Sequence, residues 1–239
     1  GPWAPAAFAP PRPRPRGGGG GGSLRRRLAS GGPSDTDRRT ALTTVLLERY
    51  GVVNREVVQS EGLSGGFSAV YPILKVMEDA GRVRRGYFVE GLGPAQFARP
   101  GVDDRLRALR DPSGEGAPMV LAATDPASPY GAAVPWPEGE PRPQRAAGAE
   151  VVLLEGALAA FIARGGESVA TFLPAEEPDR SRTAEAIGLA LSRSLERGAK
   201  KALTINRIDG DDAAVSPLAE AWRPFGFVVS GRGLLARRR

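Results

Sequence analysis

The stretch from Arg38 to Ala98 constrains the fold more than any other part of this 239-residue chain. Apolar residues recur there at helical spacing in two segments, which Gly51 and Gly81 follow. Between them, Asn54 is a good N-cap residue for a short helix, with Val53 and Val58 spaced as a hydrophobic staple. A segment rich in β-branched and aromatic residues comes next, and after a turn a short segment leads the chain back. The pattern predicts a winged helix-turn-helix, with helices over about 37–49, 55–60 and 68–79 and wing strands over 82–89 and 95–98.

The third expected helix contains one conflict. Val70, Leu74 and Met77 fall on a single helical face and should point into a core. Pro72 lies among them, and a proline inside a helix removes a hydrogen bond and clashes with the preceding turn. We therefore expect the helix to begin later or to bend at this residue.

The basic residues of the wing point to nucleic acid. Helix-turn-helix modules place their last helix in the major groove and surround it with phosphate contacts. The side chains expected to face bases or sugar are Ser68, Tyr71 and Lys75. Those expected to face phosphate, whose oxygens match the planar fork of arginine, are Arg82, Arg84 and Arg85. Two alternatives stay open: the arginines are solvated charges that protect a strand edge, or the winged helix docks another protein.

The overall charge agrees with a polyanionic partner, and the composition excludes several kinds of chemistry. The net charge is +6 and the isoelectric point is about 10.2, which favours nucleic acid as the partner. The absence of Cys and His excludes disulfides, thiol and histidine catalysis and most zinc or iron sites. We expect no metal or cofactor in this chain. No apolar run is long enough to span a membrane, so we expect a cytoplasmic protein.

Residues 1–34 have the composition of a disordered tether rich in Pro, Arg and Gly. Alternating Arg and Pro favour an extended chain, and a run of six glycines adds a flexible joint. Such a segment cannot bury enough apolar surface to fold. Its arginines either stay solvated or add sequence-independent affinity for phosphate.

The rest of the chain divides by composition. Residues 35–111 are the expected winged helix, which ends in a short basic helix over 103–110, and 112–148 are a Pro- and Gly-rich connection. Residues 149–239 are an expected second domain, with strands over 151–154, 157–163, 167–173, 202–208 and 227–230 and helices over 183–197 and 217–222. Successive hairpins with a helix predict a small β-barrel-like domain, so the whole chain is expected to be α+β.

Carboxylates are the acid–base candidates that the composition leaves. Asp125 follows an apolar run and is the candidate catalytic residue, while Asp209, Asp211 and Asp212 cluster at the end of a strand. Asp-Pro and Asp-Gly are also ordinary turn sequences. A catalytic role would require a carboxylate desolvated in a pocket beside an extruded base. The glycines within 91–93 are interpreted as a turn, because no Gly-Lys-Ser/Thr follows to make an ATP site.

A close resemblance to the C-terminal region of Lhr-type large helicase-related proteins of bacteria runs from Gly65 to Ala98, in GGFSAVYPILKVMEDAGRVRRGYFVEGLGPAQFA. The similarity continues in VDDRLRALRD and LAATDPASPYGAAVPWP. It persists more weakly in VVLLEGALAAFIARGGESVATF and GFVVSGRGLLAR, and GPWAPAAF at the start resembles the end of a preceding domain. The most specific part is RRGYFVEGL together with AQFA.

The resemblance implies the last winged helix and the terminal β-barrel module of an ATP-dependent superfamily-two helicase acting in DNA repair. In that family a separate motor uses ATP and Mg to unwind DNA or RNA–DNA hybrids, so single-stranded or duplex DNA is the implied partner. The region is similar to winged-helix DNA glycosylases, and some members are associated with uracil removal and with oligomers. The Gln-x-Gln motif of those glycosylases does not occur here, since Gln59, Gln96 and Gln144 are isolated.

Three functions therefore remain open from the sequence. The first is a nucleic-acid-binding module of a helicase, based on the basic wing. The second is base excision, with Asp125 as the acting carboxylate. The third is assembly of a homo-oligomer through the C-terminal domain.

Overall fold

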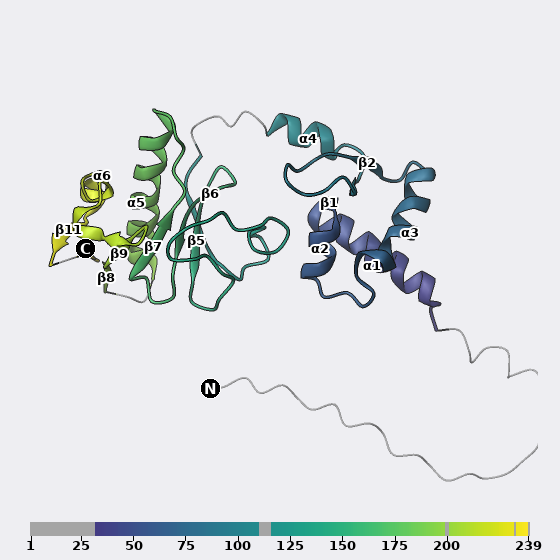
Figure 1. The fold of residues 1–239 in the computed structure, drawn as a ribbon, viewed down its shortest axis with the longest axis horizontal. Helices are drawn as coiled ribbons and strands as arrows, with labels where there is room; N and C mark the ends of the chain where they lie inside the picture. The colour runs from purple at the N-terminus through teal and green to yellow at the C-terminus, as the bar shows by residue number, and fades with distance from the viewer. Residues whose placement is uncertain (1–31, 110–115, 199–200, 232, 239) are drawn as a thin grey trace, which may run out of the picture. The chain divides into compact units, whose positions relative to one another are not determined.

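The computed structural model describes residues 32–109, 116–198, 201–231 and 233–238 (Figure 1). The predicted tether over 1–34 lies outside the described residues except for its last three positions. The described fold is α+β, as predicted, and its first part is a winged helix. Among the described residues, no helix combines the length and apolarity needed to cross a membrane.

The winged helix has three principal helices and a three-stranded antiparallel sheet (Figure 1). The helices are α1 (Asp35–Tyr50), α2 (Arg55–Ser60) and α3 (Gly66–Asp79). The strands are β1 (Val52–Val53), β2 (Arg84–Gly86) and β3 (Gln96–Ala98), in the order β1-β3-β2. The sequence did not predict β1, because two residues carry no periodicity. The strand expected over 82–89 is confined to β2, and a short helix, α4 (Val102–Ala108), follows the wing.

The sequence predicted that α3 would begin late or bend because of Pro72. The structure places Pro72 inside the helix, at its seventh position. The helix begins at Gly66, so the predicted late start was wrong. The opposite face carries Val70, Leu74 and Met77, all buried in the core of the winged helix. Pro72 is exposed, so water can bind the carbonyl that its missing N–H would have bonded. Burial of the apolar face therefore outweighs the local cost of the proline.

A polar contact joins α1 to the end of α2. Glu61 Oε1 lies 2.6 Å from Arg49 Nη1 and accepts a 2.6 Å hydrogen bond from the Tyr50 hydroxyl. The hydrogen bond from Tyr50, followed by the interaction with Arg49, lowers the pKa of Glu61 below its usual value. The same contact raises the pKa of Arg49.

We predict that Glu61→Gln makes the winged helix less sensitive to acid. The folded-state pKa of Glu61 is depressed, so its contribution to stability is present above the unfolded pKa, about 4.3, and is lost as pH falls through the folded value. Thermal unfolding between pH 6 and pH 3 should therefore show a smaller drop in melting temperature for Glu61→Gln than for the wild type. Glu48→Gln, at an exposed position of α1 with no ion pair among the described residues, is the control. Equal acid sensitivity of all three proteins would contradict the prediction.

The C-terminal part, residues 116–238, contains two open sheets. The six-stranded sheet has the order β10-β9-β7-β6-β5-β4, from β4 (Met119–Ala122), β5 (Glu150–Leu154), β6 (Ala157–Ile162), β7 (Ser168–Thr171), β9 (Arg207–Ile208) and β10 (Asp211–Asp212). The three-stranded sheet has the order β11-β12-β8, from β8 (Ala202–Ile205), β11 (Val228–Ser230) and β12 (Gly233–Arg237). Among the described strands neither sheet closes on itself, so the expected barrel is an open arrangement.

The helices of this part are α5 (Asp179–Arg197) and α6 (Leu218–Trp222), with 3-10 turns η2 (Ala213–Val215) and η3 (Arg223–Phe225). Ile187 and Leu191 of α5 are buried in one core with Val152 of β5. Trp222 is also fully buried there, and its Nε1 donates to the carbonyl of Ala184 at 2.8 Å. A Cβ at Gly188 would lie 2.7 Å from the Trp222 ring, so glycine in mid-helix permits this contact.

Several features of the C-terminal part differ from the sequence prediction. The strand expected over 227–230 is not the last one, because β12 follows it and pairs with it. The single strand expected over 202–208 is two strands in different sheets, because the chain leaves the β8–β12 pair at Asn206, whose N–H bonds to Glu167 O at 2.8 Å. Strand β4 arises within the Pro- and Gly-rich stretch that was expected to be irregular. The predicted antiparallel hairpins β5–β6 and β6–β7 are confirmed, although β7 also pairs in parallel with β9.

Candidate nucleic-acid interface

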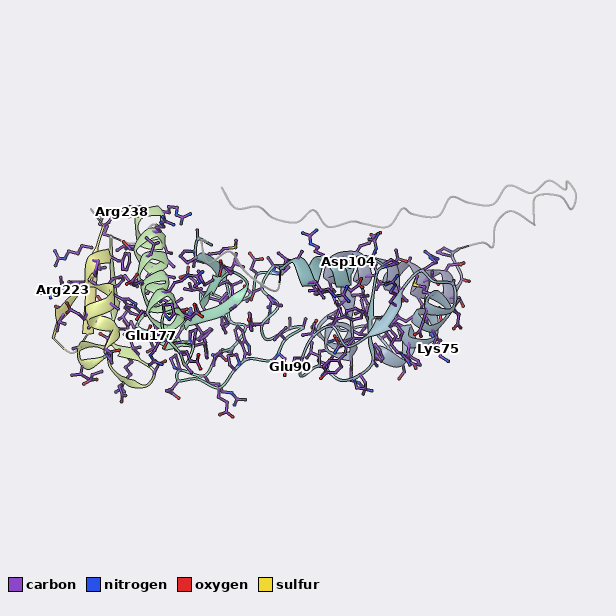
Figure 2. The ribbon with its side chains drawn as sticks, turned by 90° about the horizontal axis from the view of Figure 1, so that it is seen from above. Lys75, Glu90, Asp104, Glu177, Arg223 and Arg238 are labelled. Carbon is purple, nitrogen blue, oxygen red and sulfur yellow. The ribbon has the colours of Figure 1, made fainter. Side chains whose placement is uncertain are left out.

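The outer face of α3 carries the predicted groove-facing residues. Ser68 and Lys75 are exposed, and Figure 2 shows Lys75 at the surface of the winged helix. Tyr71 is half-buried, because its ring packs against Phe67 and meets the edge of Phe97 at 6.0 Å between ring centroids. The polar face predicted from periodicity is therefore present, with Tyr71 at its inner margin.

Arg85 does not project freely from the wing. It lies opposite Phe97 in the β2–β3 pair, and its guanidinium carbon is 5.2 Å from the Phe97 ring centroid and 5.7 Å from that of Tyr71. Its Nη2 donates a 2.5 Å hydrogen bond to the Tyr71 hydroxyl. Arg85 thus fastens the wing to α3. The guanidinium has five N–H donors, so others remain for a phosphate oxygen.

Arg84 points to the other face of the sheet. Successive strand residues alternate in direction, and Arg84 lies opposite Ala98 rather than Phe97. Its Nη1 is 3.6 Å from Asp103 Oδ2 of α4, and the Arg84 side chain remains 66% exposed. An exposed ion pair of this kind contributes about 0–1 kcal/mol. A phosphate can therefore compete with Asp103 for this arginine.

Arg82 has a neighbour that the sequence did not reveal. It is exposed, and among the described residues it makes no ion pair. It lines a hollow of about 280 Å³ together with Arg99, which follows β3, and with Glu48 of α1. The β2–β3 pairing brings Arg99 beside the start of the wing, so the sheet register, rather than any sequence motif, identifies this additional cation. We add Arg99 to the candidate phosphate contacts.

Gln96 holds the turn of the wing in place. Its side-chain oxygen accepts hydrogen bonds from the N–H groups of Phe88 at 3.1 Å and Val89 at 2.9 Å. Its side-chain nitrogen donates to the carbonyls of Val89 and Gly93, each at 2.9 Å, and also contacts the carbonyl of Leu92. Gln96 is fully buried. One amide therefore contacts backbone groups of four residues of the wing turn, a role that isolated glutamines in a sequence do not reveal.

Asp125, the predicted catalytic candidate, caps a turn. Its Oδ1 accepts a 2.8 Å hydrogen bond from Ala127 N, and its backbone carbonyl accepts from Ser128 N at 3.0 Å. Arg145 spans the same loop, donating to the carbonyls of Thr124 and Asp125 at 2.9 and 3.2 Å. Asp125 is half-buried as a residue, but the hydrogen bond of its carboxylate is exposed, so the group is not enclosed. The structure does not bring Asp125 together with the candidate residues of α3 and the wing in any described contact.

The other aspartate cluster also makes local contacts. Asp209 adopts a positive φ of 54° between β9 and β10. Its carboxylate accepts hydrogen bonds from Thr171 N at 2.6 Å and from Thr171 Oγ1 at 2.7 Å. Asp211 and Asp212 form β10 itself. Among the described residues, no group of three or more carboxylates is arranged to hold a metal ion.

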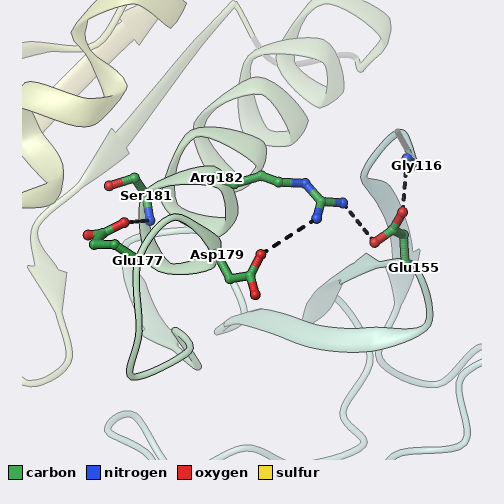
Figure 3. Close-up of polar contacts among 6 residues, drawn as sticks. All are labelled: Gly116, Glu155, Glu177, Asp179, Ser181 and Arg182. Carbon is green, nitrogen blue, oxygen red and sulfur yellow. Dashed lines mark hydrogen bonds and ion pairs between the residues drawn. The ribbon is translucent and has the colours of Figure 1, made fainter. Parts of the chain in front are cut away.

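A further polar cluster ties the β5–β6 turn to the start of α5 (Figure 3). Glu155, at a φ of 51°, binds Arg182 Nη2 at 2.7 Å and accepts from Gly116 N at 3.1 Å. Arg182 also lies 3.9 Å from Asp179. Nearby, the Ser181 hydrogen bond lowers the pKa of Glu177. Because Arg182 is held by two carboxylates, this cluster fixes a turn and offers no free cation.

Comparisons with known proteins agree with the fold. Residues 32–118 match the family model described as the winged-helix domain of large helicase-related protein. The chain is 42% identical over 202 residues to the "Lhr helicase/ probable uracil glycosylase" of Mycolicibacterium smegmatis, covering 82% of this chain and 13% of that protein. It is 36% identical over 206 residues to the "Lhr helicase/uracil glycosylase" of Escherichia coli, covering 84% and 13%. The chain thus spans about an eighth of the length of these relatives.

Proposed function

The chain belongs to the Lhr-type large helicase-related proteins, as part of their C-terminal region, and on that premise we propose that its winged helix binds nucleic acid. In this proposal the module serves a cytoplasmic DNA-repair helicase whose ATP- and Mg-dependent motor lies elsewhere in a longer protein. The ligand is single-stranded or duplex DNA, or an RNA–DNA hybrid.

The observation that carries the proposal is the set of exposed cations on α3 and at the base of the wing. Four cationic side chains of the winged helix are exposed: Lys75 on α3, Arg82 before β2, Arg84 in β2 and Arg99 after β3. Of these four, only Arg84 makes an ion pair among the described residues, at 3.6 Å. Exposed cations beside a recognition helix can neutralise phosphates on either side of a groove.

Binding to a fluorescent duplex and to the matching single strand, followed by anisotropy at several salt concentrations, tests this function. If each of these four cations neutralises one phosphate, the winged helix contributes about −3.6 to the slope of log K against log salt for duplex DNA, and less for the single strand. A flat dependence would remove phosphate neutralisation as the basis of binding. The same titration with an RNA–DNA hybrid identifies the preferred ligand.

Base excision is a second candidate function, favoured by the names of both relatives, which include uracil glycosylase. Asp125 is then the candidate carboxylate. Uracil-containing DNA incubated with the wild type and with Asp125→Asn distinguishes the cases, because asparagine can retain the hydrogen bond to Ala127 N. Cleavage by the wild type alone would support this function, and equal or absent cleavage in both would exclude a role for Asp125.

A further inference from the structure

A second group of cations lies at the C-terminal end of α5, outside the winged helix. We call it the α5-end cluster, and it consists of Arg193, Arg197, Lys201 and Arg238. All four residues are exposed. They come from the last turns of α5, the residue before β8 and the residue after β12. The fold thus brings together charges from three separate places in the sequence.

Arg238 shows how the cluster is assembled. Its guanidinium donates to the carbonyl of Glu196 at 2.7 Å and to that of Gly198 at 2.5 Å, at the end of α5. Its backbone N–H donates to the carbonyl of Lys201 at 2.9 Å, which continues the β8–β12 ladder by one residue. Lys201 and Arg238 therefore lie opposite each other, and the Arg238 side chain reaches the end of α5.

The other three cations of the cluster are not paired with carboxylates. Among the described residues, Arg193, Arg197 and Lys201 form no ion pair. Arg193 and Arg197 are one helical turn apart, which places their side chains side by side. The neighbouring acids are Glu196, in the same turn, and Glu150, which lines a hollow with Arg197. Four cations therefore face two carboxylates.

A helix C-terminus carries partial negative charge, and cations there stabilise the helix. Arg238, bonded to two helix carbonyls, serves that role directly, and Arg197 adds a 3.3 Å hydrogen bond from its Nε to the carbonyl of Arg193. These two guanidinium groups meet this need, so Arg193 and Lys201, which are exposed and form no ion pair among the described residues, exceed it. Exposed cations without carboxylate partners instead match a polyanion whose charges repeat along a line, as phosphates do in a nucleic-acid backbone.

We propose that the α5-end cluster is a second phosphate-contacting surface, which binds the backbone of the nucleic acid that the winged helix engages. The inference rests on the proposed function for the identity of its ligand, but its contacts lie in a different part of the chain. The chain then has two contact surfaces, and its salt dependence is the sum of both.

The test uses the full chain with Arg193→Gln, Arg197→Gln and Lys201→Gln combined, and with Arg238 unchanged so that α5 keeps its cap. Affinity for duplex DNA at low salt should fall at least tenfold, and the salt slope should become less steep by about 2.7, which is 0.9 for each of three contacts. The control combines Arg142→Gln, Arg180→Gln and Arg223→Gln, three exposed arginines elsewhere in the C-terminal part. Arg180 lies at the other end of α5, about 25 Å away along the helix.

The outcomes separate the two proposals. If the cluster variant binds DNA more weakly and with a less steep salt slope, while the control variant does not, the second surface is supported. Unchanged affinity with a lowered melting temperature means that the cations serve only α5, and the inference falls while the proposed function stands. If the cluster variant loses binding but substitutions in the winged helix have no effect, the proposed function falls instead. A wild type that binds no nucleic acid overturns both.

Discussion

Replacing Arg82 and Arg84 together by Gln should weaken binding to duplex DNA between tenfold and a hundredfold at low salt, by removing about two phosphate contacts. Both side chains are exposed, so the two substitutions should leave the core of the winged helix intact. Arg85 is left in place because its contacts with Tyr71 and Phe97 hold the wing against α3. The salt slope should become less steep by about 1.8, and the loss should be similar for all sequences.

The matched control is Arg38→Gln combined with Arg55→Gln, which removes the same charge from exposed positions of α1 and α2. Anisotropy titrations of both proteins against one duplex give the comparison. If the control weakens binding as much as the wing variant, net charge rather than the wing determines affinity.

Gln96→Ala should produce the largest loss of stability of any single substitution considered in the winged helix, about 3 kcal/mol, because buried backbone groups are left without partners. The N–H groups of Phe88 and Val89 lose their acceptor, and the carbonyls at the wing turn lose their donor. The turn also contributes the buried side chain of Leu92, so local disorder should spread to the core.

Amide hydrogen exchange measures this effect where it arises. The amides of Phe88 and Val89 should exchange slowly in the wild type and rapidly in Gln96→Ala. Among the described residues the tryptophans are Trp136 and Trp222, both in the C-terminal part, so their fluorescence should be unchanged. Gln59→Ala, at an exposed position of α2, should alter stability by less than about 0.5 kcal/mol. Slow exchange at Phe88 and Val89 in the Gln96 variant would show that other contacts hold the turn.

Elements with strong periodicity or clear end signals could be predicted from the sequence. The range of α2 was predicted without error, because Asn54 caps it through a 2.9 Å bond to Val57 N. The buried face of α3 followed from the spacing of its apolar residues. Strands β1 and β4 could not be predicted, since β1 is too short to show alternation and β4 lies among prolines and glycines. Their existence depends on pairing with β3 and β5, which are distant in sequence.

The candidate site, too, could be predicted from the sequence only in part. Composition and helical spacing identified the exposed cations, but could not assign Arg84 and Arg85 to opposite faces of the wing. The contact of Arg85 with Tyr71 spans 14 residues, and the pairing of Arg84 with Asp103 depends on where α4 packs. Arg99 and the α5-end cluster were missed for the same reason, because they are defined by strand register rather than by sequence proximity.

Hydrogen–deuterium exchange of the full chain, with and without a saturating DNA duplex, tests the central claim most directly. The claim is that α3 and the base of the wing contact the nucleic acid. Binding should slow exchange of amides in α3 and in residues 82–86, and this protection should decrease as salt is raised. Protection that appears elsewhere in the chain while α3 and 82–86 exchange at their free rates would contradict the claim.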